Sequence, residues 1–208
     1  MSKTPFIDGP EDGPLLLLAH GAGADSASDF MQQMAVLLAE QGIRVWRFDF
    51  PYMHKRQQDG KKRPPDRADK LLQAYREQVM QVDQPCVVGG KSMGGRIASI
   101  LAQTEDVTPQ VRGCVCLGYP FHPAGRPERL RTEHLQSLQL PQLIVQGERD
   151  AMGSVDEVPQ YSLDERLLLR WLADGNHDLK PRKASGHTHE QHMQQAAHWV
   201  ADFVRRLC

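Results

Sequence analysis

The chain has 208 residues, enough for one domain with a large core, whereas two domains would each be small. Its 25 lysines and arginines against 26 acidic residues leave a formal net charge of −1, so overall charge gives no support for nucleic acid binding or an acidic tail. Hydrophobic residues at 40% and charged residues at 25% are typical of a soluble globular protein. The sequence starts without a signal pattern, and its apolar run Leu15–Ala19 is too short to span a bilayer. We therefore expect a cytoplasmic protein.

The predicted elements begin with residues 1–14, whose proline, glycine and acids indicate a loose arm or a short edge strand. The continuous apolar run over residues 15–19 predicts a strand buried on both faces. Further strands are predicted over residues 43–48, 86–90, 113–117, 143–147 and 167–172. Helical patterns separate these runs, so we expect a mostly parallel sheet of six to seven strands with helices on both faces. No linker or repeat divides the sequence, which predicts a single three-layer α/β domain over residues 1–208.

Helix boundaries are predicted from proline, glycine and capping residues. One helix is expected to begin at residues 64–66 and to bury Leu71, Leu72, Tyr75 and Val79. A Ser-x-x-Glu box at Ser154 predicts a short helix, and a Thr-x-x-Gln box at Thr188 predicts the start of the final one. The basic stretch over residues 54–63 has little apolar content and is expected to be a loop.

The four cysteines follow no metal-ligand spacing. Cys114 and Cys116 fall on one face of a predicted strand, Cys86 opens another, and Cys208 ends the sequence. Free cysteines on strands usually act as small buried apolar side chains. We expect all four to be reduced, and the sequence implies neither a metal nor an organic cofactor.

A Gly-x-Ser-x-Gly pentapeptide over residues 90–94 lies between a β-branched run and a helical pattern. In that context the central residue occupies a sharp, strained turn that exposes its hydroxyl above the sheet edge. The flanking glycines leave room for the crossing strand and helix. The pentapeptide therefore predicts Ser92 as a nucleophile. Gly-Lys-Ser also matches part of a phosphate loop, but Pro85 stands where that motif needs its first glycine.

A serine nucleophile needs a base to accept its proton and an acid to orient the base. Such groups gather at the carboxyl ends of strands in open α/β sheets. Asp150 follows a predicted strand and is preferred over Glu148 and Asp156 as the acid, with local turn capping as the alternative. His177 follows the last predicted strand and completes the chain order serine, acid, histidine. A solvated helix face accounts for three other histidines: His187, His189 and His192.

The negative oxygen formed by serine attack on a carbonyl is usually held by two backbone N–H groups. This oxyanion hole is predicted at Met93, directly after the nucleophile, and at Ala22, in the loop after the first long strand. Gly21 and Gly23 let that loop approach a substrate, although an ordinary strand-to-helix loop is the alternative. His20 is expected to pack beneath the loop and to hold its shape.

Four features in chain order resemble the α/β-hydrolase superfamily from residue 15 onward: the His-Gly-Ala-Gly loop at His20, the turn around Ser92, Asp150 and His177. Gly-Glu-Arg-Asp at 147–150 and Gly-Asn-His at 175–177 are similar to signatures of dienelactone-hydrolase-like members, which typically carry a cysteine nucleophile. Gly-Gly-Lys-Ser-Met-Gly-Gly-Arg and Lys-Arg-Pro-Pro-Asp-Arg more closely resemble the hydrolase-like family of testis-expressed and NSL-complex proteins. The resemblance implies an α/β-hydrolase fold and leaves the substrate open.

No cap domain is expected, because residues 117–140 are the only room for a helical lid and much of this segment is typical of a loop. The site should therefore be open. Four residues are expected to line a substrate pocket, with core packing as the alternative for each: Tyr52, Tyr119, Phe121 and Met152. The basic residues from Lys55 to Arg63 form either a solvated loop or a surface that favours anionic substrates.

Together these patterns predict a serine hydrolase that cleaves a small-molecule ester or thioester through an acyl-enzyme. Ser92 would attack, His177 would transfer the proton and Asp150 would orient His177. Neither nucleic acid nor a membrane is expected as a partner, and the oligomeric state is not indicated. Two alternatives stay open: a serine peptidase of the same fold, and a hydrolase-like binding module without activity.

Overall fold

The computed structural model describes residues 5–104 and 109–208. Seven strands in these residues form one sheet: β1 (Phe6–Asp8), β2 (Leu15–Ala19), β3 (Arg44–Phe48), β4 (Cys86–Lys91), β5 (Val111–Leu117), β6 (Gln142–Gly147) and β7 (Leu168–Leu172). Their order across the sheet is β1-β3-β2-β4-β5-β6-β7. The edge strand β1 runs antiparallel to β3, and all other pairs are parallel. The predicted mostly parallel sheet is confirmed.

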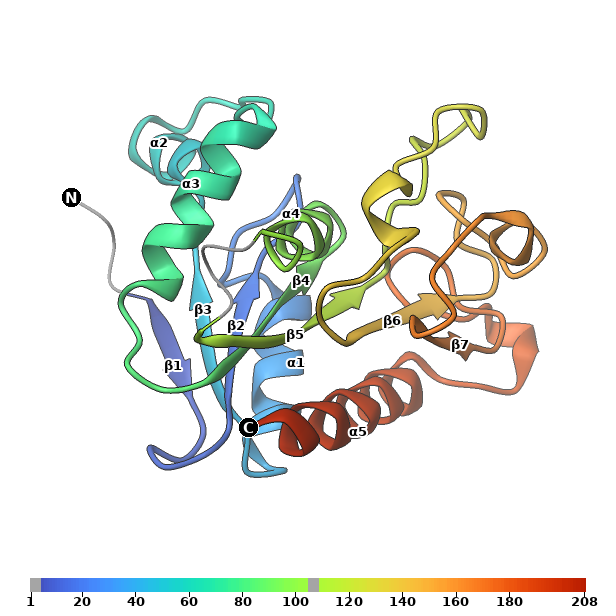
Figure 1. Cartoon of the computed structure of the whole chain (residues 1–208). Helices are drawn as coiled ribbons and strands as arrows, with labels where there is room; N and C mark the ends of the chain where they lie inside the picture. The colour runs from blue at the N-terminus through green and yellow to red at the C-terminus, as the bar shows by residue number, and fades with distance from the viewer. Residues whose placement is uncertain (1–4, 105–108) are drawn as a thin grey trace.

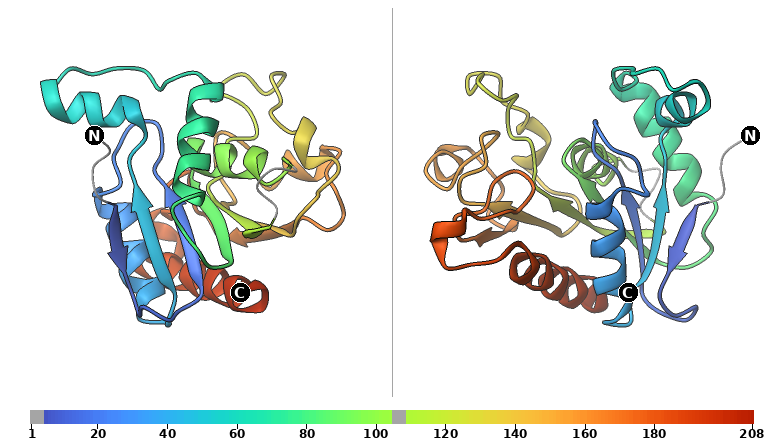
Figure 2. Two further views of the ribbon diagram at one scale, coloured as in Figure 1. Left: turned by 60° about the vertical axis from the view of Figure 1, so that its left-hand side comes forward. Right: turned by 180° about the vertical axis from the view of Figure 1, so that it is seen from behind.

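Five α-helices in the described residues cover this sheet (Figure 1): α1 (Asp29–Ala39), α2 (Pro51–Asp59), α3 (Ala68–Val79), α4 (Met93–Leu101) and α5 (His189–Leu207). The helices α1 and α5 pack on one face, whereas α3 and α4 pack on the other. The helix α2 lies near the carboxyl ends of the parallel strands (Figure 2). Within the described residues, no helix has both the length and the apolar character needed to cross a bilayer.

The four leucines of β2 explain its central place in the sheet. Each of them is at most 2% exposed. Leu15 and Leu17 face the core beneath α3 and α4, whereas Leu16 and Leu18 face the core beneath α1 and α5. Burying each side chain contributes about 1.5–3 kcal/mol to folding. This strand is therefore held from both faces, as its uninterrupted apolar sequence predicts.

The Tyr75 hydroxyl fastens α3 to two central strands. It accepts a hydrogen bond from the Gly89 N–H at 2.8 Å. The same oxygen lies 2.8 Å from the carbonyl oxygens of Leu17 and Gly89, to which it can donate. Tyr75 is fully buried, and this burial raises the pKa of its phenol well above the usual value. A buried hydroxyl such as this one stabilises the fold only when its hydrogen bonds are made.

Substituting Tyr75→Phe is expected to lower the free energy of unfolding by about 1–3 kcal/mol, because it leaves the Gly89 N–H buried without an acceptor. Urea unfolding followed by circular dichroism measures the change. Tyr161→Phe is the matched control, since the Tyr161 hydroxyl makes no hydrogen bond within the described residues. Equal stability of the two variants would contradict the role given to Tyr75.

Two helix boundaries differ from the sequence prediction. Residues 54–59, expected in a loop, belong to α2, which has Pro51 in its first turn and Gly60 in the left-handed conformation at its end. Only two residues of α2 are buried, so it has almost no apolar periodicity. The helix α3 begins at Ala68 rather than at residues 64–66, because the backbone before it stays extended.

The two predicted capping boxes have different outcomes. Thr188 Oγ1 accepts from the Gln191 N–H, and the Gln191 side chain accepts from the Thr188 N–H, so the box at the final helix is confirmed. Ser154 instead donates both its N–H and its hydroxyl to the Glu157 carboxylate. Only a single 3₁₀ turn follows, over Val158–Gln160.

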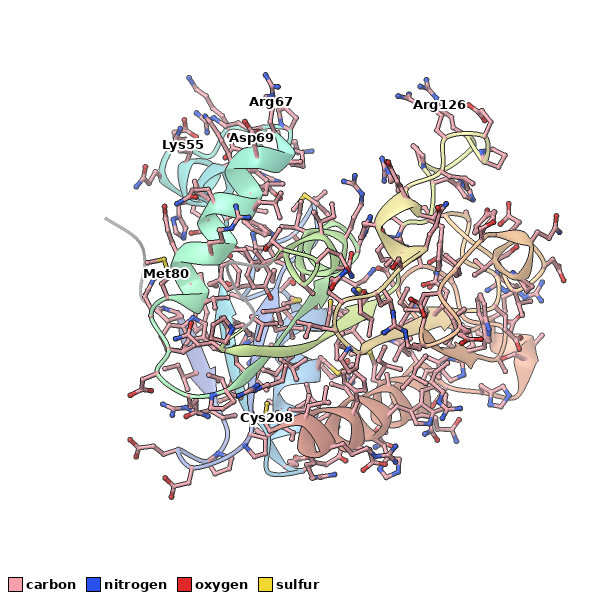
Figure 3. All side chains as sticks on the ribbon, in the orientation of Figure 1. Lys55, Arg67, Asp69, Met80, Arg126 and Cys208 are labelled. Atoms are coloured by element: carbon pink, nitrogen blue, oxygen red, sulfur yellow. The ribbon has the colours of Figure 1, made fainter. Side chains whose placement is uncertain are left out.

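All four cysteines are free thiols. Cys86 in β4 and both Cys114 and Cys116 in β5 are fully buried, whereas Cys208 is exposed at the end of α5 (Figure 3). Burial raises the pKa of Cys86 to about 12 and holds that of Cys114 well above its usual value. Cys86 and Cys114 therefore stay protonated, and all three buried thiols pack as apolar side chains.

Candidate active site

Ser92 lies where β4 ends and α4 begins. Its φ of 51° and ψ of −115° place it in a conformation that L-residues rarely adopt. A Cβ on Gly94 would lie 2.5 Å from the carbonyl oxygen of Ala19, and one on Gly90 would lie 2.6 Å from the same atom. The chain can therefore turn this sharply only with glycine at both positions. The result is a half-buried serine at the carboxyl edge of the sheet.

Three loops bring Ser92, His177 and Asp150 into one hydrogen-bonded chain. Ser92 Oγ donates to His177 Nε2 at 2.7 Å, and His177 Nδ1 donates to Asp150 Oδ2 at 2.7 Å. The Asp150 side chain is fully buried, whereas that of His177 is 22% exposed. An ionised carboxylate only accepts, so Nδ1 carries the imidazole proton and Nε2 is free to take the serine proton. This arrangement can activate a hydroxyl as a nucleophile.

A buried glutamine holds the Asp150 carboxylate in place. Gln146 Nε2 donates to Asp150 Oδ2 at 2.8 Å, and the Met152 N–H donates to Asp150 Oδ1 at 2.8 Å. Gln146 Oε1 accepts from the Tyr119 N–H at 2.7 Å, which fixes the amide itself. Gln146 was not among the predicted site residues. A polar residue directly after the apolar run Leu143–Ile144–Val145 of β6 is the sequence signal that points to it.

Lys91 fastens the His177 loop to the Ser92 turn. Its Nζ donates to the His177 carbonyl oxygen at 2.8 Å and lies 3.2 Å from Asp178 Oδ1. The ammonium also lies 5.4 Å from the centre of the Phe30 ring. Burial lowers the pKa of Lys91, and the Asp178 carboxylate acts in the opposite direction. Lys91 was also missed from sequence, although a lysine at the end of a buried strand is a visible signal.

The N–H groups of Ala22 and Met93 find no acceptor within the described residues. The carbonyl groups of the Ala22 loop are turned the other way, and the Tyr52 hydroxyl donates to the Ala22 oxygen at 3.1 Å. His20 lies beneath the loop, where its Nδ1 donates to the Gly21 oxygen at 2.6 Å and its Nε2 accepts from a backbone N–H at 3.1 Å. Burial lowers the pKa of His20, which keeps it neutral. Both amides are therefore free to bind a negative oxygen.

Two cavities meet at Ser92. The α4 cavity, of about 310 Å³, is lined by Ala22, Pro65, Asp66, Ala68, Leu71, Ser92, Met93, Arg96, Ile97, Pro120, Arg131 and Met152. The α1 cavity, of about 290 Å³, is lined by Gly21, Ala22, Gly23, Ala24, Ser28, Phe30, Met31, Lys91, Ser92, Met152, His177 and Asp178. The hydroxyl of Ser92 is thus accessible from two sides, and only the α1 cavity reaches His177.

The predicted pocket residues divide into two groups. Three line these cavities: Gly21, Gly23 and Met152. Three others line neither cavity and are at most 2% exposed: Tyr52, Tyr119 and Phe121. Tyr52 supports the Ala22 loop from below, and Tyr119 packs edge-on against Phe121 with ring centres 4.8 Å apart. An aromatic residue just after a strand can turn inward or outward, and its sequence position does not decide between the two.

Two of the clustered histidines have a structural role that a solvated helix face does not describe. His192 is buried and its Nδ1 lies 2.9 Å from the Leu179 oxygen, whereas His189 Nε2 lies 3.0 Å from the Asp178 oxygen. Both therefore brace the segment that follows His177. Across residues 5–104 and 109–208, no group of three or more His, Cys, Asp or Glu side chains is placed to hold a metal ion.

A family model described as an alpha/beta hydrolase domain matches residues 12–205. The chain belongs to the α/β-hydrolase family. Solved structures similar to this α/β-hydrolase include Est1E from Butyrivibrio proteoclasticus, with 17% identity, a TM-score of 0.67, and coverage of 98% of this chain and 93% of the other. Dienelactone hydrolase from Anabaena variabilis has 18% identity and a TM-score of 0.68, with coverage of 97% of this chain and 90% of the other. The thioesterase domain from the curacin biosynthetic pathway has 17% identity and a TM-score of 0.64, with coverage of 96% of this chain and 93% of the other. At these identities the likeness shows the fold of the hydrolase.

Proposed function

We propose that this α/β-hydrolase cleaves a carboxylic ester or thioester through an acyl-enzyme, with Ser92, His177 and Asp150 as its catalytic triad. The observation that carries the proposal is the chain of two 2.7 Å hydrogen bonds that ends on a serine with a φ of 51°. Structures named as an esterase and a thioesterase domain are among those of similar fold, which agrees with this reaction class. Unlike the dienelactone-hydrolase-like signature, the nucleophile here is serine, which argues against lactone opening.

The reaction follows from the positions of these groups. His177 Nε2 takes the Ser92 proton while Oγ bonds to the substrate carbonyl carbon, and the Ala22 and Met93 N–H groups bind the resulting oxyanion. When the intermediate collapses, the bond from carbon to the leaving oxygen or sulfur breaks and His177 donates its proton to that atom. Water then attacks the acyl-enzyme with His177 as base, which releases the acid and restores Ser92. Asp150 holds the imidazole orientation throughout.

An uncharged fluorophosphonate and a set of substrates with one acyl group test the proposal. We expect wild-type protein to be labelled at Ser92 and to hydrolyse the p-nitrophenyl ester and the thioester, with little cleavage of the p-nitroanilide. Cleavage of a peptide amide at a comparable rate would instead identify a serine peptidase. A wild-type protein that is neither labelled nor active would identify a binding module whose triad is unused.

Removing the ammonium that holds the His177 loop should slow the reaction. We expect Lys91→Met to lower kcat by roughly 10- to 100-fold with a smaller change in KM, because a lost charged hydrogen bond of this kind is worth about 1.5–3 kcal/mol and its loss lets the His177 loop move. Steady-state hydrolysis of a p-nitrophenyl ester measures both constants. Lys180→Met is the control, since the Lys180 side chain is exposed on the same loop. A rise in KM at constant kcat would contradict a positioning role.

The closer resemblance to the hydrolase-like family of testis-expressed and NSL-complex proteins rests on the motifs around Ser92 and residues 62–67. We offer this subfamily, and a single domain over residues 1–208, as part of the same proposal. The motifs refine the expected site and do not indicate an acyl group.

A further inference from the structure

Two arginines line the α4 cavity without a carboxylate partner. Arg96 and Arg131 form no ion pair and donate no side-chain hydrogen bond within the described residues. Arg96 Nε is buried and unbonded. Other arginines of this chain do have carboxylate partners: Arg47 with Asp8, Arg63 with Asp59 and Arg182 with Asp174. Exposed arginines such as Arg126 and Arg170 also have no carboxylate partner among the described residues, so the distinguishing feature of Arg96 and Arg131 is that both line one cavity beside Ser92.

Both arginines have firmly placed backbones. Arg96 lies one turn along α4 from the nucleophile, and its N–H donates to the Ser92 oxygen at 3.0 Å. The Arg131 N–H donates to the Phe121 oxygen at 2.8 Å, and the Tyr119 hydroxyl donates to the Arg131 oxygen at 2.8 Å. The two buried aromatic residues, Tyr119 and Phe121, line neither cavity at Ser92 and thus hold Arg131 at the edge of the α4 cavity. The arginine positions are set by the fold.

The two guanidinium groups act on each other. Burial lowers the pKa of Arg131, and the charge of Arg96 lowers it further. Asp66 is the one acidic residue that lines the α4 cavity, so the two arginines leave an excess of positive charge there. Like charges held together are unfavourable unless an anion joins them, and a guanidinium fork binds carboxylate oxygens in pairs.

The position of His177 decides which half of a substrate occupies this cavity. His177 must reach the leaving atom to protonate it, so the leaving group lies in the α1 cavity, which His177 lines. The acyl group then extends into the α4 cavity. The wall there is largely apolar, with Leu71, Met93 and Ile97, and suits a hydrocarbon chain.

We propose that the acyl group of the substrate ends in a carboxylate, and that Arg96 and Arg131 bind it. The substrate class is then a half-ester or half-thioester of a dicarboxylic acid, and this inference rests on the proposed hydrolase activity. No residue from Lys55 to Arg63 lines either cavity at Ser92. In that segment Arg63 pairs with Asp59, and Arg56 donates to the Gly23 oxygen at 3.3 Å.

Matched substrates test the charge of the acyl group. The p-nitrophenyl half-esters of adipic and suberic acid are compared with the same molecules capped as methyl esters, and release of p-nitrophenol is followed. We expect kcat/KM of wild-type protein to be roughly 10- to 100-fold higher for the free carboxylates, and this ratio to fall at high salt. In Arg96→Met and Arg131→Met the ratio should fall toward one.

Arg126→Met provides the control. It removes the same charge from the tip of the loop after β5, away from the α4 cavity, and should keep the wild-type ratio (Figure 3). A wild-type ratio of one or less, or a ratio kept by both arginine variants, would overturn the inference. Should Arg96→Met fail to fold, Arg96→Gln and the salt dependence of the wild-type ratio still decide it. Wild-type protein that resists an uncharged fluorophosphonate and cleaves neither ester would instead overturn the proposed hydrolase activity.

Discussion

Ser92→Ala is expected to abolish fluorophosphonate labelling and to lower kcat/KM for ester hydrolysis by roughly 10⁴- to 10⁶-fold. The substitution removes the hydroxyl that His177 Nε2 contacts at 2.7 Å and leaves the Ala22 and Met93 amides in place. Hydrolysis above the uncatalysed rate would then come from the amides and from substrate binding alone. Mass spectrometry of labelled protein and initial rates with a p-nitrophenyl ester measure the two effects.

The fold should survive this change, because alanine is smaller than serine and the backbone turn depends on the glycines around it. Unfolding by urea should therefore give nearly the wild-type midpoint. Ser162→Ala is the control, since Ser162 is exposed and its hydroxyl makes no hydrogen bond within the described residues. Labelling that persists in Ser92→Ala would place the nucleophile elsewhere.

Asp150→Asn is expected to lower kcat by roughly 10³- to 10⁴-fold with a small change in KM. Asp150 accepts three N–H groups, from His177, Gln146 and the Met152 backbone. An asparagine side chain has an NH₂ group in place of one carboxylate oxygen, so at least one of these three N–H groups then faces another donor and loses its hydrogen bond. The imidazolium formed during attack also loses the negative charge that stabilises it.

A matched variant separates this role from general electrostatics. Asp156→Asn removes the same charge a few residues later, where the carboxylate is exposed and unbonded among the described residues, and should leave kcat unchanged. Fluorophosphonate labelling of Asp150→Asn should slow in parallel with kcat. If Asp156→Asn were the impaired variant, the acid of the triad would have to be reassigned.

The fold was predictable because its signals are local. The four leucines of β2 and the turn at Ser92 each carry their own pattern, and both the parallel sheet and the helical layers follow from strands alternating with helices. The order of the strands was not predicted. Asp150 and His177 were found by position alone, since strand ends converge at one edge of the sheet. Their hydrogen bonds agree with that placement, while their catalytic roles stay predictions.

Other features depend on tertiary contacts that no short pattern records. The helix α2 has too few buried residues to show a period. Tyr119 was expected in the pocket but turns inward to hold the Arg131 oxygen. Arg96 was given no role from the sequence, and its relation to Arg131, contributed by a loop after the next strand, exists only once the chain is folded. Side-chain direction, more than element type, is what the sequence left undecided.

The reaction of the buried thiols of β4 and β5 with an alkylating reagent can report when the centre of the sheet opens. An alkylating reagent added to folded protein meets Cys208 at once, because that thiol is exposed. Cys86, Cys114 and Cys116 react only after the middle strands separate, so their slow modification measures the free energy of opening the sheet centre under native conditions. A substrate analogue that binds at the ends of these strands should slow the same modification by mass action.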